Sequence, residues 1–337
     1  MDAGRISPLY FIYGDEKYMV KRAAKRLIKK LAPESFVEFN LNEFSSDAVV
    51  DSISDAAEAL PFMAERKLVV VSDFNIEQKN STEISKLTEM LSALPESTTI
   101  IFYFPTVQFD AKKTAKWKNF LKIADKAGTS IFYPLLSETD LKKLITREIE
   151  KRKCTISRPN VTLLVEYVGG ELNALLNEVD KLCSYVNGGE ISTEIIERLV
   201  PKSMESTAFI LANALVSGNY ERAYRTLEIL FYAGEEPIAI LAALSSVYVD
   251  MYRVRAAVQS GLSYSSAASS GEYRGREFRL RNAERNARSL STEVLRDCLN
   301  ILLETDILLK SSKLDSRILM DKLIAKLLLA TKGEEKL

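Results

Sequence analysis

The sequence lacks histidine entirely and has only three cysteines and one tryptophan among its 337 residues. Without histidine, the chain has neither the commonest general base at neutral pH nor the commonest transition-metal ligand. Catalysis by aspartate, glutamate or lysine stays open, but we expect no catalytic residue, no metal site and no cofactor. The odd number and wide spacing of Cys154, Cys183 and Cys298 predict reduced, buried thiols, and argue against disulfides or a zinc site.

A net charge and a long apolar run are also missing. The 46 basic and 46 acidic residues cancel, so any contact with nucleic acid must come from a local patch. The longest nearly uncharged stretch, between Glu236 and Asp250, is shorter than the roughly 18 apolar residues of a membrane-spanning helix. The amino terminus has no signal-peptide layout. We therefore expect a globular, cytoplasmic protein that does not associate with membranes.

The first part of the chain alternates between strand-like and helical patterns. Short runs rich in β-branched and aromatic residues predict strands. In residues 15–31, apolar side chains recur at helical spacing while lysine and arginine occupy the opposite face. This alternation is typical of parallel βαβ units. We predict a layered α/β domain with strands at residues 9–13, 36–41, 67–73, 99–104 and 129–134.

Beyond residue 134 the patterns are helical, and we predict no strand there. Short helices interrupted at Gly169-Gly170 and at Asn187-Gly188-Gly189 predict a small helical domain. Longer helices follow, the last of them near residues 292–310 and 316–332. The expected fold class is α/β followed by all-α, with three domains at residues 1–136, 137–204 and 205–337.

The turn Gly14-Asp15-Glu16 follows the first strand and leads into a helix, a layout from which many α/β proteins bind a nucleotide phosphate. A phosphate-binding loop needs several glycines, whose N–H groups converge on the anion, and a lysine that neutralises its charge. This turn has one glycine and two carboxylates. Because these carboxylates suit the positive end of the helix dipole and repel a triphosphate, we predict a turn that is stable without a ligand.

A second unusual segment surrounds Pro61 with the apolar residues Leu60, Phe62 and Met63, just before a strong strand pattern. The proline ends the preceding helical pattern, which leaves Phe62 and Met63 near a loop. These side chains can enter a pocket of a partner protein, where burying each is worth roughly 1.5–3 kcal/mol. They can equally fold back into the core. The residues alone leave both interpretations open.

The segment between residues 273 and 290 is rich in arginine. If it is helical, four of these arginines share one face and form a candidate stripe for contacting phosphates or an interface. Several glutamates lie between them, which favours the alternative of a solvated or interface face. The four residues are Arg274, Arg281, Arg285 and Arg288.

Five segments, in this order, make the chain resemble the delta subunit of the bacterial DNA polymerase III clamp loader over nearly its whole length. The resemblance implies a nucleotide-free AAA+-like α/β domain without the phosphate-binding lysine, then a small helical lid domain and a C-terminal helical collar. The segments are "YFIYGDEKYMVKRA" (10–23), "LPFMAERKLVVVSD" (60–73), "GGELNALLNEVDKL" (169–182), "GNYERAYRTLEILFYAGEEPIAILAAL" (218–244) and "LLETDILLKSS" (302–312).

The resemblance also implies a role in DNA replication. In this family a hydrophobic pair of the first domain enters a pocket on the sliding clamp, the beta subunit, and helps to open the ring. Matched through Arg66 and the following strand, that pair falls on Phe62 and Met63, with Leu60 beside them. The usual clamp-binding pattern has a glutamine where this chain has Glu58. The polar half of the contact therefore does not match the family pattern, and the apolar half is the part that carries over.

The resemblance implies further partners within the DNA-directed DNA polymerase (nucleotidyltransferase) holoenzyme. The collar would hold the subunit beside ATP-hydrolysing subunits of the tau or gamma type and a delta-prime subunit. Hydrolysis would then occur in other chains, and DNA would be reached through the complex.

Two other functions stay open at this point. One is an AAA+-class NTPase, which ATP binding by the isolated chain would favour and which the missing loop lysine disfavours. The other is a helical nucleic-acid-binding protein that acts through Arg274–Arg288, which predicts salt-sensitive affinity for DNA.

Overall fold

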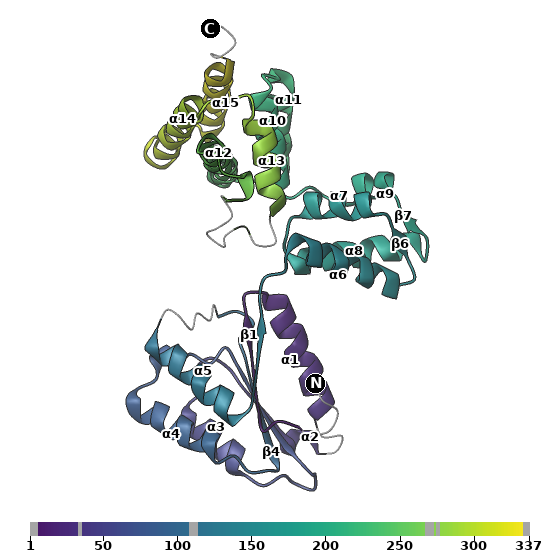
Figure 1. The fold of residues 1–337 in the computed structure, drawn as a ribbon, viewed down its shortest axis with the longest axis vertical. Helices are drawn as coiled ribbons and strands as arrows, with labels where there is room; N and C mark the ends of the chain where they lie inside the picture. The colour runs from purple at the N-terminus through teal and green to yellow at the C-terminus, as the bar shows by residue number, and fades with distance from the viewer. Residues whose placement is uncertain (1–5, 33–35, 108–113, 267–272, 274–276, 333–337) are drawn as a thin grey trace. The chain divides into compact units, whose positions relative to one another are not determined.

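The computed structural model describes residues 6–32, 36–107, 114–266, 273 and 277–332. The chain divides into two compact units, Met1–Leu135 and Leu136–Leu337 (Figure 1). The first unit holds a parallel sheet with helices, and the second is almost wholly helical. The predicted fold class, α/β followed by all-α, is confirmed. The further division of the helical part at residue 204 stays a prediction.

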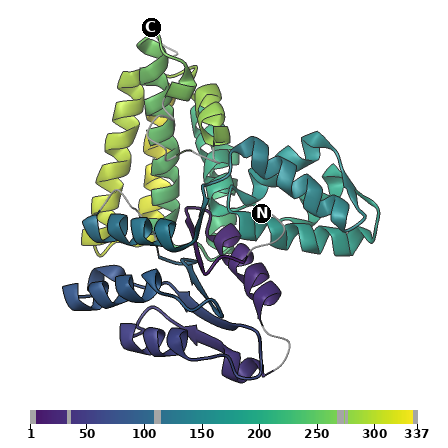
Figure 2. The ribbon, with the colours of Figure 1, turned by 60° about the horizontal axis from the view of Figure 1, so that its bottom comes forward.

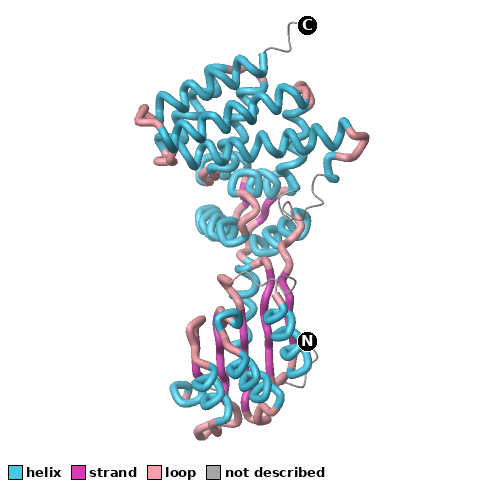
Figure 3. Tube along the Cα trace, turned by 90° about the vertical axis from the view of Figure 1, so that its left-hand side faces the viewer, coloured by secondary structure: helices cyan, strands magenta, loops and turns pink. Residues whose placement is uncertain are grey.

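The first unit is built on a parallel sheet (Figure 3). Its five strands lie in the order β2-β3-β4-β1-β5. Every neighbouring pair of its strands is parallel. The central strands β3 and β4 are buried along nearly their whole length, as expected when helices cover both faces of a sheet. The strands are β1 (Leu9–Gly14), β2 (Leu41–Phe44), β3 (Lys67–Ser72), β4 (Thr98–Tyr103) and β5 (Thr129–Tyr133).

Helices cover the two faces of this sheet in separate layers (Figure 1). On one face, helix α1 (Lys17–Leu31) buries Val20, Ala24 and Leu27 in one apolar cluster with strand residues of the sheet. The opposite face carries a larger apolar cluster rich in phenylalanine. That cluster receives side chains from the short 3-10 helix η1 (Ile76–Gln78), α3 (Val50–Glu58), α4 (Ser81–Ser92) and α5 (Ala115–Ala127).

The predicted strand at residues 36–41 is wrong. A one-turn helix, α2 (Val37–Asn40), occupies most of it, and β2 begins only at Leu41. Phe36 starts this turn with a left-handed φ of 53°, and the Asn40 side chain closes it by donating to the Phe36 carbonyl at 3.1 Å. Phe36 and Phe39 resemble buried strand residues in the sequence, but here they face solvent.

The second unit begins with four helices and a very small two-stranded sheet at one end of them (Figure 1). Its strands, β6 (Thr155–Ile156) and β7 (Glu190–Ile191), are parallel and two residues long, so the prediction of no strand beyond residue 134 is wrong. Strands this short leave too little periodic pattern in a sequence to be recognised. The helices are α6 (Glu138–Lys151), α7 (Arg158–Val168), α8 (Leu172–Val186) and α9 (Thr193–Leu199).

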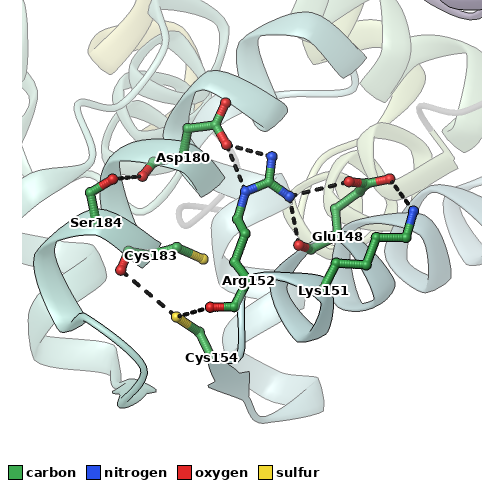
Figure 4. Close-up of polar contacts among 7 residues, drawn as sticks. All are labelled: Glu148, Lys151, Arg152, Cys154, Asp180, Cys183 and Ser184. Carbon is green, nitrogen blue, oxygen red and sulfur yellow. Dashed lines mark hydrogen bonds and ion pairs between the residues drawn. The ribbon is translucent and has the colours of Figure 1, made fainter. Parts of the chain in front are cut away.

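A charged cluster ties the end of α6 to α8 (Figure 4). The Arg152 guanidinium pairs with Asp180 of α8 at 2.5 Å and also donates to the Glu148 carboxylate and carbonyl. Below it, the Cys154 thiol lies 3.7 Å from the Cys183 carbonyl. Burial raises the pKa of Cys183 to about 12, so this thiol stays protonated. All three cysteines are buried and free, as predicted.

The remaining helices of the second unit pack into one bundle around α12 (Figure 2). By length and composition, α12 is the one helix among the described residues that could cross a membrane. This helix is 23 residues long, so it extends past the uncharged stretch between Glu236 and Asp250. Its buried residues pack in the core of this unit. The bundle helices are α10 (Met204–Val216), α11 (Tyr220–Tyr232), α12 (Pro237–Gln259), α13 (Glu277–Ala287), α14 (Thr292–Ser311) and α15 (Ser316–Lys332).

Candidate functional site

The glycine that ends β1 is required by close packing against β5. Gly14 lies opposite Tyr133 in the β1–β5 register and has a φ of +151°. A Cβ atom at Gly14 would lie 2.0 Å from the Tyr133 carbonyl oxygen, far inside any contact distance. The glycine therefore serves strand packing.

The backbone N–H groups that follow Gly14 are already hydrogen-bonded. Both Asp15 and Glu16 donate to the Tyr133 carbonyl, at 2.9 and 3.1 Å. In a phosphate-binding turn these N–H groups would point to the anion. Glu16 lies at the N-cap of α1, and Asp15 is exposed beside it. The turn thus combines satisfied donors with negative charge, which is unfavourable for a nucleotide phosphate.

The lysine that follows this turn in the sequence, Lys17, also has hydrogen-bond partners within the chain. Its ammonium donates to the Val107 carbonyl at 2.5 Å and to the Phe104 carbonyl at 3.4 Å. Burial lowers the pKa of Lys17, against the opposing effect of the Asp15 and Asp73 carboxylates. The cation is held by the loop that follows β4.

Asp73 holds the same loop from the end of β3. Its carboxylate accepts from the N–H groups of Thr106 and Val107, at 3.0 and 2.9 Å, and from the Thr106 hydroxyl at 2.7 Å. Lys17, which follows β1, and Asp73, which follows β3, therefore both hold the loop after β4 at the carboxyl edge of the sheet. Among the described residues, no group of three or more potential metal ligands comes together.

The Pro61 segment is a solvent-exposed loop of the first unit, between α3 and β3. Helix α3 ends at Glu58, and residues 59–66 have no regular structure. Leu60 is 82% exposed, Met63 74% and Phe62 49%. These side chains therefore do not fold back into the core, and their contact with a partner stays a prediction. We call Leu60–Met63 the apolar tip.

The apolar tip is supported by the helical turn α2. The Phe62 ring lies 5.3 Å from the Phe36 ring in an edge-to-face arrangement and 5.1 Å from the Phe39 ring. Both partners are exposed themselves. Sequence reasoning missed this support because the two segments are more than twenty residues apart. Phe62 is thus partly covered by two aromatic rings, while Leu60 and Met63 are more exposed to solvent.

The tip also contains a strained residue. Met63 has a left-handed φ of 47°, which a non-glycine residue adopts at a cost. Such strain persists where surrounding contacts hold it, and it is common at binding sites. Glu58, in the place of the usual clamp-motif glutamine, is the last residue of α3 and accepts a hydrogen bond from the Ser54 hydroxyl at 2.8 Å.

Carboxylates of the chain engage two arginines of the predicted stripe. Arg281 binds both oxygens of Glu138, at 2.5 and 2.7 Å, and Arg288, in the turn beyond α13, pairs with Glu284 at 3.2 Å. Arg285 is exposed on α13. Arg274 lies outside the described residues. Two of the three described arginines of the stripe are therefore engaged in intramolecular ion pairs.

Sequence reasoning also missed the part that Arg279 plays. This arginine is partly buried, with 17% of its side chain exposed, and it pairs with Asp250 of α12 at 2.6 Å and with Glu205 of α10 at 2.8 Å. Asp250 accepts a further hydrogen bond from the Tyr273 hydroxyl at 2.6 Å. Arg279 is thus a packing residue that anchors α13 to the bundle.

Comparison with solved structures identifies the class of fold. The chain superimposes on the Bacillus subtilis DNA clamp loader delta protein with a TM-score of 0.67 and 24% sequence identity, and the match covers 96% of each chain. The parallel-sheet unit followed by a helical unit is therefore the fold of a clamp-loader delta protein.

Sequence comparisons identify the family. The model of the DNA polymerase III delta subunit matches residues 10–129, and the model of that subunit's C-terminal domain matches residues 205–327. DNA polymerase III subunit delta of Bacillus subtilis is 27% identical over 96% of this chain and 94% of its own length. A probable delta subunit of Aquifex aeolicus is 22% identical over 75% of this chain and 72% of its own. The chain belongs to the DNA polymerase III delta subunit family.

Proposed function

We propose that the chain binds the sliding clamp through Leu60, Phe62 and Met63 and helps to open it, without hydrolysing ATP itself. The observation that carries this proposal is the apolar tip, a group of large side chains that face solvent on a loop of the first unit. Insertion into a pocket of the clamp would remove these side chains from water, at roughly 1.5–3 kcal/mol for each one fully buried.

The tip is suited to a pocket because its shape is already fixed. Its left-handed residue and its aromatic support limit the conformations that binding must select. A preorganised loop loses less conformational entropy on binding than a mobile one. By binding an opened form of the clamp more tightly than the closed ring, the chain would shift the clamp towards opening.

The polar network at Gly14 supports the absence of ATP hydrolysis in this chain. The N–H groups of Asp15 and Glu16 and the ammonium of Lys17 are all hydrogen-bonded to carbonyls of the chain. A nucleotide would have to break these bonds and approach two carboxylates. Hydrolysis in the clamp loader would then belong to neighbouring subunits of the tau or gamma type.

Association with those subunits, and with a delta-prime subunit, is assigned to the collar, residues 205–337. Large apolar side chains of α14 and α15 face solvent there, and Leu303 and Ile307 are one turn apart on the same side of α14. Such exposed apolar residues are typical of protein interfaces. DNA would be reached through the assembled complex, and this role places the protein in the cytoplasm. Further exposed apolar residues near them are Leu314, between the two helices, and Ile318 and Leu329 of α15.

The proposal is tested by capturing the sliding clamp of the same organism on the purified chain, without nucleotide. The double variant Phe62→Ala/Met63→Ala should lose the clamp. Phe132→Ala is the matched control, because Phe132 lies in the same unit and is also 49% exposed. It should retain the clamp. Normal capture by a folded double variant would overturn the site.

Ring opening is tested separately with clamps closed on nicked circular DNA. The chain alone should speed the release of these clamps, and the double variant should not. Equal release with and without the chain, despite clamp capture, would show that it binds the clamp without opening it.

A further inference from the structure

We propose that Asn40 is a positioning residue that holds the apolar tip in the conformation the clamp recognises. The inference rests on the proposed function, and it assigns a role to a residue that does not itself contact the clamp. Asn40 is completely buried at the end of α2, 22 residues before Phe62.

The Asn40 side chain pairs with the backbone of the tip as a neighbouring strand would. Its Oδ1 accepts from the Phe62 N–H at 2.7 Å, and its Nδ2 donates to the Phe62 carbonyl at 2.9 Å. The second N–H of the same amide donates to the Phe36 carbonyl at 3.1 Å. One side chain thus fixes both backbone groups of Phe62 and joins them to the turn that carries Phe36 and Phe39.

The rest of the tip has few other restraints. Its flanks are fixed where the Thr98 hydroxyl donates to the Ala57 carbonyl at 2.8 Å and where Arg66 donates to the Thr99 hydroxyl at 2.9 Å. Between residues 60 and 66, Phe62 is the residue whose backbone is hydrogen-bonded within the described part of the chain. Removing the Asn40 amide would therefore free the centre of the loop.

The strain at Met63 makes this restraint important. A left-handed methionine returns to a more favourable backbone conformation when its neighbour is released. Without Asn40, the tip would sample many conformations, and the clamp would bind only a fraction of them. Its apparent affinity would fall by that fraction, although every contacting side chain is still present.

The test compares Asn40→Ala with Asn160→Ala, using the full chain and its own clamp. Asn160 is a matched control because it is also a buried asparagine, and its amide donates to the Ile191 carbonyl at 3.0 Å in the second unit. Clamp affinity, melting temperature and hydrogen exchange of the Phe62 amide are measured for both.

We expect Asn40→Ala to weaken clamp binding by about tenfold or more and to speed exchange of the Phe62 amide. Asn160→Ala should lower the melting temperature without either effect. If Asn40→Ala does not fold, Asn40→Asp decides the matter by the same readouts, because it keeps the volume and loses both donors.

Two outcomes separate this inference from the proposed function. If Asn40→Ala binds the clamp within twofold of the unmodified chain while Phe62→Ala/Met63→Ala does not bind, the positioning role is wrong and the site stands. If Phe62→Ala/Met63→Ala binds normally, the proposed site fails, and the role of Asn40 fails with it.

Discussion

At the scale of single residues, two short segments have opposite properties. The turn at Gly14 has its donors satisfied by Tyr133, whereas the apolar tip leaves large side chains in water. Binding needs groups that are still unsatisfied before the partner arrives. The chain therefore offers a partner protein its apolar tip, and offers a nucleotide no free donor among the N–H groups of Asp15 and Glu16.

The packing of Gly14 predicts a large cost for any side chain at that position. Gly14→Ala should lower the free energy of unfolding of the first unit by about 2–3 kcal/mol, because the new Cβ meets the Tyr133 carbonyl and the φ value is unfavourable. Urea unfolding followed by the fluorescence of Trp117, the single tryptophan and a buried residue of this unit, measures the change. An unchanged midpoint would show that the strands separate easily.

The sequence indicated part of the tip but not its support. Pro61 correctly predicted the end of the helix and the loop that carries Phe62 and Met63. The role of Asn40 could not be predicted. It lies within residues 36–41, which were wrongly predicted as a strand, and an asparagine in such a segment gives no sign of hydrogen bonds to Phe62. Such a pairing depends on how β2 and β3 lie side by side, which is a property of the folded sheet.

At the scale of elements, β1, β3, β4 and β5 were predicted well, whereas β2 and the two-residue strands β6 and β7 were not. The runs that became β3 and β4 are apolar because helices cover both faces, so their pattern is clear. Residues 36–41 have the same composition on a surface, where Phe36 and Phe39 support Phe62. The ion pairs of the arginine-rich segment could not be predicted for a different reason, since the partners of Arg279 and Arg281 are distant in sequence.

The ion pair between Arg279 and the buried Asp250 predicts a strong coupling between α13 and α12. Arg279→Ala should cost about 3–5 kcal/mol, because it leaves the Asp250 carboxylate buried without its cation. The double variant Arg279→Ala/Asp250→Ala should cost less than the sum of the two single changes. Unfolding in urea followed by circular dichroism measures this cycle, and simple additivity would contradict the coupling.

The ion pair between Arg281 of α13 and Glu138 of α6 predicts that the stability of the chain depends on pH. Glu138 is buried, which raises its pKa, but hydrogen bonds and charges from Lys142 and Arg281 outweigh this and lower the pKa below the ordinary value of 4.5. Its contribution is therefore present above pH 4.5 and is lost as the pH falls through the lowered folded-state value.

Glu138→Gln should accordingly destabilise the chain at pH 7, and the difference from the unmodified chain should shrink in acid. Urea unfolding at several pH values between 3 and 7 measures it. A difference that is independent of pH would show that the Glu138 carboxylate contributes through its shape and not its charge.

At the scale of the whole molecule, the chain would act by binding other proteins. Its charges cancel, so no overall field draws it to DNA. Exposed apolar residues of the described chain include those of the apolar tip in the first unit and others on α11, α14 and α15 of the second. These surfaces suit a subunit that works inside a protein assembly.

The same view predicts that ATP leaves the isolated chain unchanged. A ligand that binds the folded state stabilises it by about 2.7 kcal/mol at one hundred times its Kd. With magnesium and millimolar ATP, the melting temperature should therefore stay constant. A clear rise would indicate that the bonds to Tyr133 and Val107 open for a nucleotide and would support an NTPase.

Contact between the apolar tip and the sliding clamp can be captured with a photo-crosslinking amino acid at position 63, or at position 132 as a control, in the presence of the clamp and without nucleotide. We expect an efficient crosslink to the clamp from position 63, unaffected by ATP, and little or none from position 132. No crosslink from position 63, or equal crosslinks from both positions, would contradict the claim that the apolar tip binds the clamp.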